Sequence, residues 1–121
     1  MLPDAGDIAW VDFNPTLGSE QAGRRPALVI TAGSYHEQSW RAVVCPITSK
    51  YRPWPFNVSL PEGLQTSGVV LIDQVRTIDR SRRMFEIIER VPDAFVDEVR
   101  GRLGALLGID SISVVPAPYE R

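Results

Sequence analysis

The sequence contains few of the residues that build metal sites and covalent cross-links. Cys45 is the only cysteine and His36 the only histidine in a chain of 121 residues. An intrachain disulfide therefore cannot form, and no Cys/His spacing suggests zinc. We expect no metal and no cofactor, and a reducing cytoplasm is the simplest compartment. Cys45 itself lies in the apolar run AVVCPI, where we expect a small buried side chain rather than a nucleophile.

Long apolar segments are also missing. No run approaches the ~20 residues needed to cross a bilayer, so we expect no association with a membrane. The N-terminal stretch MLPDAGDIAW lacks the cationic start and the long apolar segment of a signal peptide. We therefore expect the chain to stay in the cytoplasm.

Excess positive charge is absent as well. The formal net charge is -2 and the pI is about 5.3, which argues against a broad basic surface that grips duplex DNA. A local basic pocket is still compatible with this balance, because net charge does not fix where the 13 cationic side chains lie. All of these except Lys50 are arginine. Guanidinium groups bind phosphate in a forked geometry, but a genome that favours arginine codons explains the bias equally well.

Short strand-like runs dominate the chain, which we expect to fold as a single domain over residues 1–121. They are DIAWVDF (7–13), PALVIT (26–31), AVVCPIT (42–48), FNVSL (56–60), GVVLIDQVRTI (68–78) and MFEIIERV (84–91). The first has apolar residues on both faces, which indicates a central strand, and the fifth is long enough for a strand with a bend. Six strands joined by loops with Gly and Pro predict a small, strongly curled antiparallel sheet or barrel.

One helix is predicted near the C-terminus. Apolar residues recur at helical spacing in VPDAFVDEVRGRLGALLG (91–108). Gly108 suits a C-terminal cap, whereas Gly101 and Gly104 each oppose a helix by roughly 1 kcal/mol and leave a smooth patch for another backbone. We predict a helix packed over the barrel. The tail 109–121 is either an added strand up to Val115 or a proline-broken, mobile end.

A polar loop stands directly before the second strand, in GSEQAGRRPALVI (18–30). Together with GDIAWVDFNPT before it, CPITSKYRPWPFNV, GVVLIDQVRTID and the C-terminal helix, this block resembles the MazF/PemK/Kid family of toxin endoribonucleases over about residues 6–108. The resemblance implies a mainly β, SH3-like small barrel with a C-terminal helix. It also implies a homodimer, metal-independent cleavage of single-stranded RNA such as mRNA, and silencing by an acidic antitoxin.

The resemblance also assigns roles to individual residues. Arg25, before the proline of the G-x-R-P block, is the implied catalytic residue, and Thr48 of the C-P-x-T block is its partner. Glu20 is the third catalytic candidate. The residues implied in RNA binding are Ser19, Gln21, Ser49, Asp73 and Gln74. One branch of the family has an arginine two residues before the aspartate, where this chain has Leu71, so Arg25 acts more alone here.

The reaction needs these residue types. Attack by the 2′-hydroxyl requires a base, a proton for the leaving 5′-oxygen and positive charge for the crowded phosphate. Arg25 can supply the charge in a fixed, bidentate geometry, and Pro26 holds it in an extended conformation. Thr48 can donate a hydrogen bond to a phosphate oxygen. Glu20 is the available carboxylate, either as the base or as a group that positions Arg25 or a nucleotide.

Structural interpretations of the same residues stay open. Arg25 also fits a solvated strand end, Thr48 a β-former near a turn, and Glu20–Arg25 a surface ion pair worth ~0–1 kcal/mol. Asp73 and Gln74 can bond loop backbone. We expect His36 to be a solvated loop residue. The aromatic loop 51–56 has two interpretations: Tyr51 and Trp54 stack on unpaired bases, or Trp54 and Phe56 anchor the loop to the core.

Two other functions are considered. Gyrase-targeting toxins of the same fold act by binding a protein, through a C-terminal end that contains tryptophan, whereas this chain ends in PAPYER and retains the Arg25 and Thr48 blocks. A small RNA-binding barrel without catalysis is the other alternative. Mapping the ends of a treated single-stranded RNA separates all three.

Overall fold

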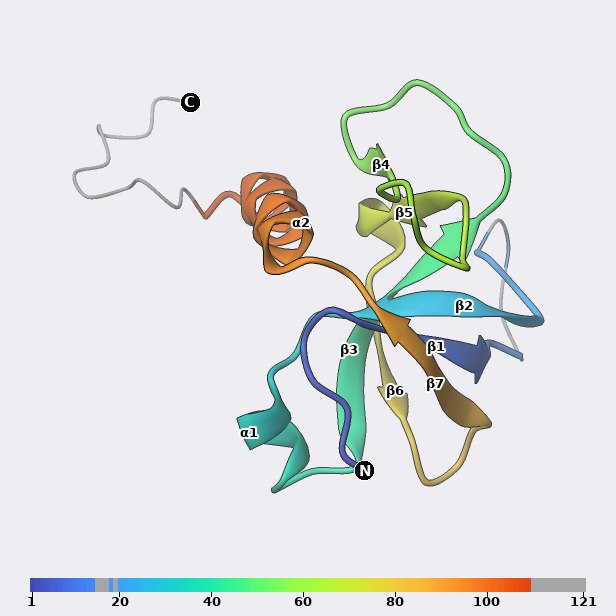
Figure 1. The fold of residues 1–121 in the computed structure, drawn as a ribbon, viewed down its shortest axis with the longest axis vertical. Helices are drawn as coiled ribbons and strands as arrows, with labels where there is room; N and C mark the ends of the chain where they lie inside the picture. The colour runs from blue at the N-terminus through green and yellow to red at the C-terminus, as the bar shows by residue number, and fades with distance from the viewer. Residues whose placement is uncertain (15–17, 19, 110–121) are drawn as a thin grey trace.

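The computed structural model describes residues 1–14, 18 and 20–109 (Figure 1). Ser19 lies outside these residues, and so does the predicted tail after Ile109. The elements, in chain order, are β1 (Asp7–Asp12), β2 (Arg24–Val29), α1 (Gly33–His36), β3 (Arg41–Thr48), β4 (Asn57–Ser59), β5 (Val69–Leu71), the 3₁₀ helix η1 (Ile72–Gln74), β6 (Arg76–Asp79), β7 (Phe85–Arg90) and α2 (Asp93–Leu106). Neither α-helix of the described part is long and apolar enough to span a bilayer.

The seven strands form one antiparallel sheet in the order β4-β5-β3-β2-β1-β7, with β6 also paired to β3. The sheet is open and curled, and α2 lies against it beside η1 (Figure 1). This arrangement confirms the predicted mainly β fold with a C-terminal helix.

β1 is a central strand, as its two apolar faces predicted. It pairs with β2 on one side and β7 on the other. Ile8 belongs to the larger core cluster, whereas Ala9, Val11 and Phe13 belong to a second cluster on the opposite face. All four side chains are fully buried, but Trp10 is 42% exposed because the larger cluster does not extend to it.

The run 68–78 was predicted to be one strand with a bend. It is instead two strands, β5 and β6, separated by η1. Val44 of β3 pairs with Arg76, and Ile47 pairs with Val70. A step of three residues along β3 is therefore matched by a step of six on its partners, and the three extra residues are those of η1. Strand propensity does not reveal this turn, because the apolar residues 69–72 are typical of a strand and Ile72 is buried as a strand residue would be.

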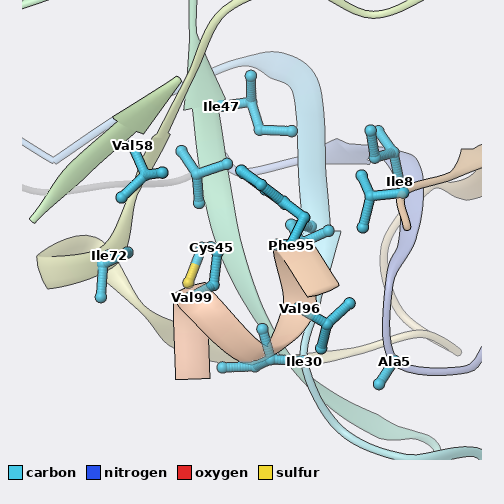
Figure 2. Close-up of a cluster of buried hydrophobic side chains, with 13 residues drawn as sticks. Ala5, Ile8, Ile30, Cys45, Ile47, Val58, Ile72, Phe95, Val96 and Val99 are labelled. Atoms are coloured by element: carbon cyan, nitrogen blue, oxygen red, sulfur yellow. The ribbon is translucent and has the colours of Figure 1, made fainter. Parts of the chain in front are cut away.

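α2 covers the larger core cluster (Figure 2). Its residues Phe95, Val96 and Val99 are part of this cluster together with Cys45 of β3 and Ile30, which follows β2, and this confirms the predicted amphipathic helix. The helix closes where the Ile109 N–H donates to the Gly104 carbonyl oxygen at 2.7 Å. A Cβ on Gly104 would lie 2.9 Å from the Ile109 carbonyl oxygen, so the backbone that approaches this glycine is the chain's own.

His36 corrects a prediction, because it is buried rather than solvated. It ends α1, a short helix that the sequence analysis did not predict, and its side chain is 3% exposed. Its Nδ1 lies 2.7 Å from the Pro3 carbonyl oxygen, and its Nε2 lies 2.7 Å from Thr31 Oγ1. Since the carbonyl can only accept, Nδ1 carries a proton. His36 therefore joins the N-terminal segment to the end of β2.

Replacing His36 by leucine is expected to lower the free energy of unfolding by about 2 kcal/mol, because a buried carbonyl and a hydroxyl lose their partner. Gln38→Leu on the same short segment, where the side chain is exposed, is the matched control and should change stability by less than about 0.5 kcal/mol. Urea denaturation of both variants measures the difference. Equal midpoints would show that the two contacts of His36 do not stabilise the fold.

Candidate active site

The polar loop between β1 and β2 is fixed at its base. The Phe13 N–H donates to the Gly23 carbonyl at 2.9 Å, and the Gly23 N–H donates to Asn14 Oδ1 at 3.1 Å. Arg83 Nη1 donates to the carbonyl oxygens of Asp12 and Asn14 at 2.9 and 2.8 Å. These bonds hold both ends of the loop against the sheet, so the residues it carries start from defined positions.

Arg25 lies at the start of β2 and is half-buried. It pairs with Val11 of β1, and its Nε donates to the Ala22 carbonyl oxygen at 3.1 Å. This bond turns the guanidinium back toward the loop. Among the described residues, its two terminal nitrogens make no hydrogen bond, so they can receive an anion. Pro26 follows Arg25 and restricts its backbone to the extended region.

Thr48 ends β3 and is 8% exposed. Its Oγ1 accepts the Lys50 N–H at 3.2 Å, which leaves its own hydroxyl hydrogen able to donate. Ala27 of β2 pairs with Pro46 of β3. Continuing this register sets Arg25 and Thr48 at corresponding positions, where the two strands diverge.

Gly68 allows β5 to lie close to the end of β3. Its φ is +134°, and a Cβ there would come within 2.5 Å of the Thr48 carbonyl oxygen. No other residue type avoids this collision. Gly68 therefore helps to set the position of Thr48.

η1 carries the two polar residues of the DQVR block. The Gln74 side-chain oxygen accepts the Gln21 N–H at 2.9 Å, which ties the polar loop to η1. Asp73 Oδ2 accepts the Trp54 indole N–H at 3.1 Å, which ties η1 to the next loop. Because η1 is inserted into the β3 ladder, both side chains lie where β2, β3 and their loops meet.

Two adjoining clefts share Gln21, Asp73 and Gln74. The first, of about 640 Å³, is also lined by Thr48, Lys50, Arg52, Pro53, Trp54, Asn57 and Leu71. The second, of about 360 Å³, is also lined by Glu20, Pro46, Val75 and Arg76. The clefts thus bring together Glu20, Gln21, Thr48, Asp73 and Gln74 of the predicted site. Of the other predicted residues, Arg25 and the exposed Ser49 are outside both linings, and Ser19 is not described.

The structure separates the two interpretations of the aromatic loop. Phe56 packs against the larger core cluster and anchors the loop. Trp54 contacts the edge of Phe56, with ring centres 5.6 Å apart, yet half of its surface stays exposed. Tyr51 is 59% exposed. Phe56 is therefore an anchor, whereas Trp54 is tied to Asp73 by its indole N–H and still lines the first cleft with half of its surface exposed.

Arg76 is a site residue that the sequence analysis missed. Arg76 stands in β6, where it pairs with Val44 of β3. It lines the second cleft with Glu20, and its guanidinium carbon lies 5.5 Å from the centre of the Phe13 ring. A cation over a ring face is held electrostatically. A signal was available in the sequence. Arg76 and Ile78 are two residues apart, so in a strand they lie on the same face.

The only cysteine, Cys45, lies in the core and lines neither cleft. Burial, together with the negative charge of Asp73, raises the pKa of the Cys45 thiol to about 12. Cys45 is therefore protonated at neutral pH and is a poor nucleophile, which supports its predicted role as a buried apolar side chain.

Within the described ranges, no three His, Cys, Asp or Glu side chains gather where they could share a metal ion.

With this geometry in place, comparison with known proteins identifies the family. The sequence matches PemK-like, MazF-like toxins of type II toxin-antitoxin systems over residues 4–107. The chain belongs to this family. It is 42% identical to the endoribonuclease PemK of Escherichia coli over 108 residues, which cover 86% of this chain and 81% of the relative.

Solved structures of PemK/MazF-family proteins are similar too. MazF from Deinococcus radiodurans superposes with a TM-score of 0.85 at 44% identity, covering 90% of this chain and 99% of the relative. The MazE-MazF structure from the same organism gives a TM-score of 0.80 at 42% identity, covering 91% of this chain and 100% of that one. The predicted resemblance is confirmed, and the enzymatic relative favours RNA cleavage over the two alternative functions.

Proposed function

We propose that this PemK/MazF-family chain is a cytoplasmic, sequence-specific endoribonuclease that cleaves single-stranded RNA without a metal ion. The observation that carries the proposal is the register of β2 and β3: continued by two residues beyond Ala27 and Pro46, it sets Arg25 at the position that corresponds to Thr48, which lines the first cleft. Family membership supports it, because the matched relative is an endoribonuclease. Since the substrate carries its own nucleophile, the 2′-hydroxyl, no metal-bound water is required.

Charge stabilisation is the role proposed for Arg25. Attack of the 2′-oxygen on phosphorus gives a phosphorane with extra negative charge, and the Arg25 guanidinium neutralises it. The Nε bond to Ala22 fixes the guanidinium before RNA arrives, so little reorganisation is needed. Thr48 donates its hydroxyl hydrogen to a non-bridging phosphate oxygen, because its acceptor side is already used by Lys50.

Glu20 is the proposed base. It lines the second cleft on the side of the polar loop, where it can accept the proton of the 2′-hydroxyl. Departure of the 5′-oxygen then leaves a 2′,3′-cyclic phosphate on one product and, as that oxygen takes a proton from water, a 5′-hydroxyl on the other. Across this cleft, Arg76 supplies a second positive charge.

The first cleft is the proposed path of the RNA. Lys50 and Arg52 line it and can neutralise backbone phosphates, and Trp54 offers a ring face to an unpaired base. Gln21, Asp73 and Gln74 add hydrogen-bonding groups along the same wall, and Ser49 and Ser19 would extend this set from the two loops.

Incubation with mixed-sequence single-stranded RNA should therefore yield short-motif cleavage with 2′,3′-cyclic phosphate and 5′-hydroxyl ends. Activity should persist in EDTA, and a single deoxyribose at the cut position should block cleavage but permit binding. End mapping by primer extension and mass spectrometry measures both. Binding without any cut would favour the non-catalytic barrel, and inhibition of gyrase without a cut would favour the protein-binding toxin.

Variants of the strand ends test the mechanism. Arg25→Ala should slow the single-turnover step by about 10²–10³-fold, the cost of losing one preorganised charge-stabilising donor, and Thr48→Ala by about tenfold. Arg82→Ala removes one exposed arginine that lines neither cleft and should leave the rate unchanged.

In the same assay, Glu20→Gln should remove the acidic limb of the pH–rate profile. An unchanged profile would assign Glu20 to positioning instead of proton transfer. Folded Arg25→Ala that cleaves at the wild-type rate would contradict the assignment of Arg25.

The proposed partners are a second copy of the chain and an acidic antitoxin. A MazE-MazF structure is among the similar ones, and the cations at the clefts can accept carboxylates in place of phosphates. Light scattering should give a mass of about twice the 13.5 kDa of one chain. An acidic antitoxin segment should compete with RNA and bind more weakly as salt rises; a monomer mass, or independent binding of both ligands, would contradict these expectations.

A further inference from the structure

The loop 49–56 forms the outer wall of the first cleft, and little of its backbone is paired. It arches from the end of β3 to β4 above the sheet (Figure 1). Its residues 49–55 are exposed, and Pro53 and Pro55 have no N–H to donate. Backbone bonds hold only its C-terminal end, where the Trp54 and Phe56 carbonyl oxygens accept the N–H groups of Asn57 and Ile72, each at 2.9 Å. The rest of the loop depends on side chains to hold one conformation.

Besides the bond from the Lys50 N–H to Thr48 Oγ1, three side-chain bonds supply this anchorage. Asn57 Nδ2 donates to the Arg52 carbonyl at 3.0 Å, and Trp54 Nε1 donates to Asp73 Oδ2 at 3.1 Å. The third bond comes from α2, where Arg102 Nη1 donates to the Pro55 carbonyl at 2.6 Å. The first two bonds come from residues of the cleft wall itself, whereas Arg102 is not among the residues that line either cleft.

Glu98 holds Arg102 in place. Its Oε2 lies 3.0 Å from Arg102 Nη2, one helical turn away, and both side chains are partly exposed. An isolated pair of this kind contributes little to stability. Here the guanidinium uses two different nitrogens, one for the carboxylate and one for the carbonyl next to Trp54. The pair thus fixes the direction from which Arg102 reaches the loop.

We propose that Arg102, oriented by Glu98, is a positioning residue through which α2 sets the RNA-binding wall of the first cleft. It does so by holding Pro55, and with it the Trp54 ring, beside Asp73. The inference rests on the proposed function and deepens it, because it assigns base binding near the cut to a loop controlled by the C-terminal helix. Arg102 acts on affinity and base preference and leaves the chemical step to Arg25 and Thr48.

The test compares Arg102→Ala, Arg102→Lys and Glu98→Gln with Arg82→Ala, which removes an arginine that also pairs with a nearby acid. With a short RNA that contains one cut site, Arg102→Ala should raise KM about tenfold, within the range of one base–aromatic stack, with kcat changed less than about twofold. Arg102→Lys should restore part of the affinity, Glu98→Gln should show a smaller loss, and Arg82→Ala should match the wild type.

A double variant separates positioning from direct contact. If Arg102 acts through Trp54, Trp54→Ala combined with Arg102→Ala should bind RNA no more weakly than Trp54→Ala alone. Additive losses would show that Arg102 acts on RNA independently and would overturn the proposal. A fall in kcat at constant KM would overturn it as well.

A measurement without RNA keeps the proposal separate from the proposed function. The chain has three tryptophans, so Trp10→Phe with Trp40→Phe leaves Trp54 as the only reporter. In this background, Arg102→Ala should increase acrylamide quenching of Trp54, and Arg82→Ala should not. Unchanged quenching would overturn the role of Arg102, whereas changed quenching in a chain that cuts no RNA would overturn only the proposed function.

Discussion

The site depends on β3 being shared by three strands. One edge of β3 pairs with β2, and the other pairs first with β6 and then with β5. The change of partner requires the chain to leave the ladder between them, and η1 is the result. Asp73 and Gln74 protrude at this interruption, next to the ends of β2 and β3. A continuous strand from 68 to 78 would place alternate side chains on opposite faces, and the clefts would lose their common wall.

Electrostatics follow from this geometry more than from composition. The chain is weakly acidic overall, yet Lys50, Arg52 and Arg76 all line the two clefts. Several acids elsewhere are occupied by local bonds. Backbone N–H groups of Gly33 and Ala5 lower the pKa of Asp4, and the Thr66 hydroxyl lowers the pKa of Glu89. Both carboxylates hold loops, and neither lines a cleft; the acids that face the cations of the clefts are Glu20 and Asp73.

Sequence alone predicted the elements whose pattern is repeated along the chain. Alternation in β1 and helical spacing in α2 each involve many residues, so single exceptions such as Trp10 do not hide them. His36 and η1 were not predicted, because each is decided by a partner distant in sequence: Pro3 and Thr31 surround the histidine, and β3 decides where the strand breaks. Arg76 was missed for the same reason, since its ring partner Phe13 lies on another strand.

The proposed division between chemistry and recognition has a structural basis. Arg25 and Thr48 stand on paired strands, where a substitution that moves the backbone also disturbs the sheet. The loop 49–56 is held largely by bonds that involve side chains and by backbone groups at its C-terminal end, so its side chains can vary without breaking the sheet's own hydrogen bonds. Because Arg102 contacts a backbone carbonyl, every residue type at position 55 offers it the same acceptor. A new RNA preference can therefore arise in this loop while the position of the proposed catalytic groups stays fixed.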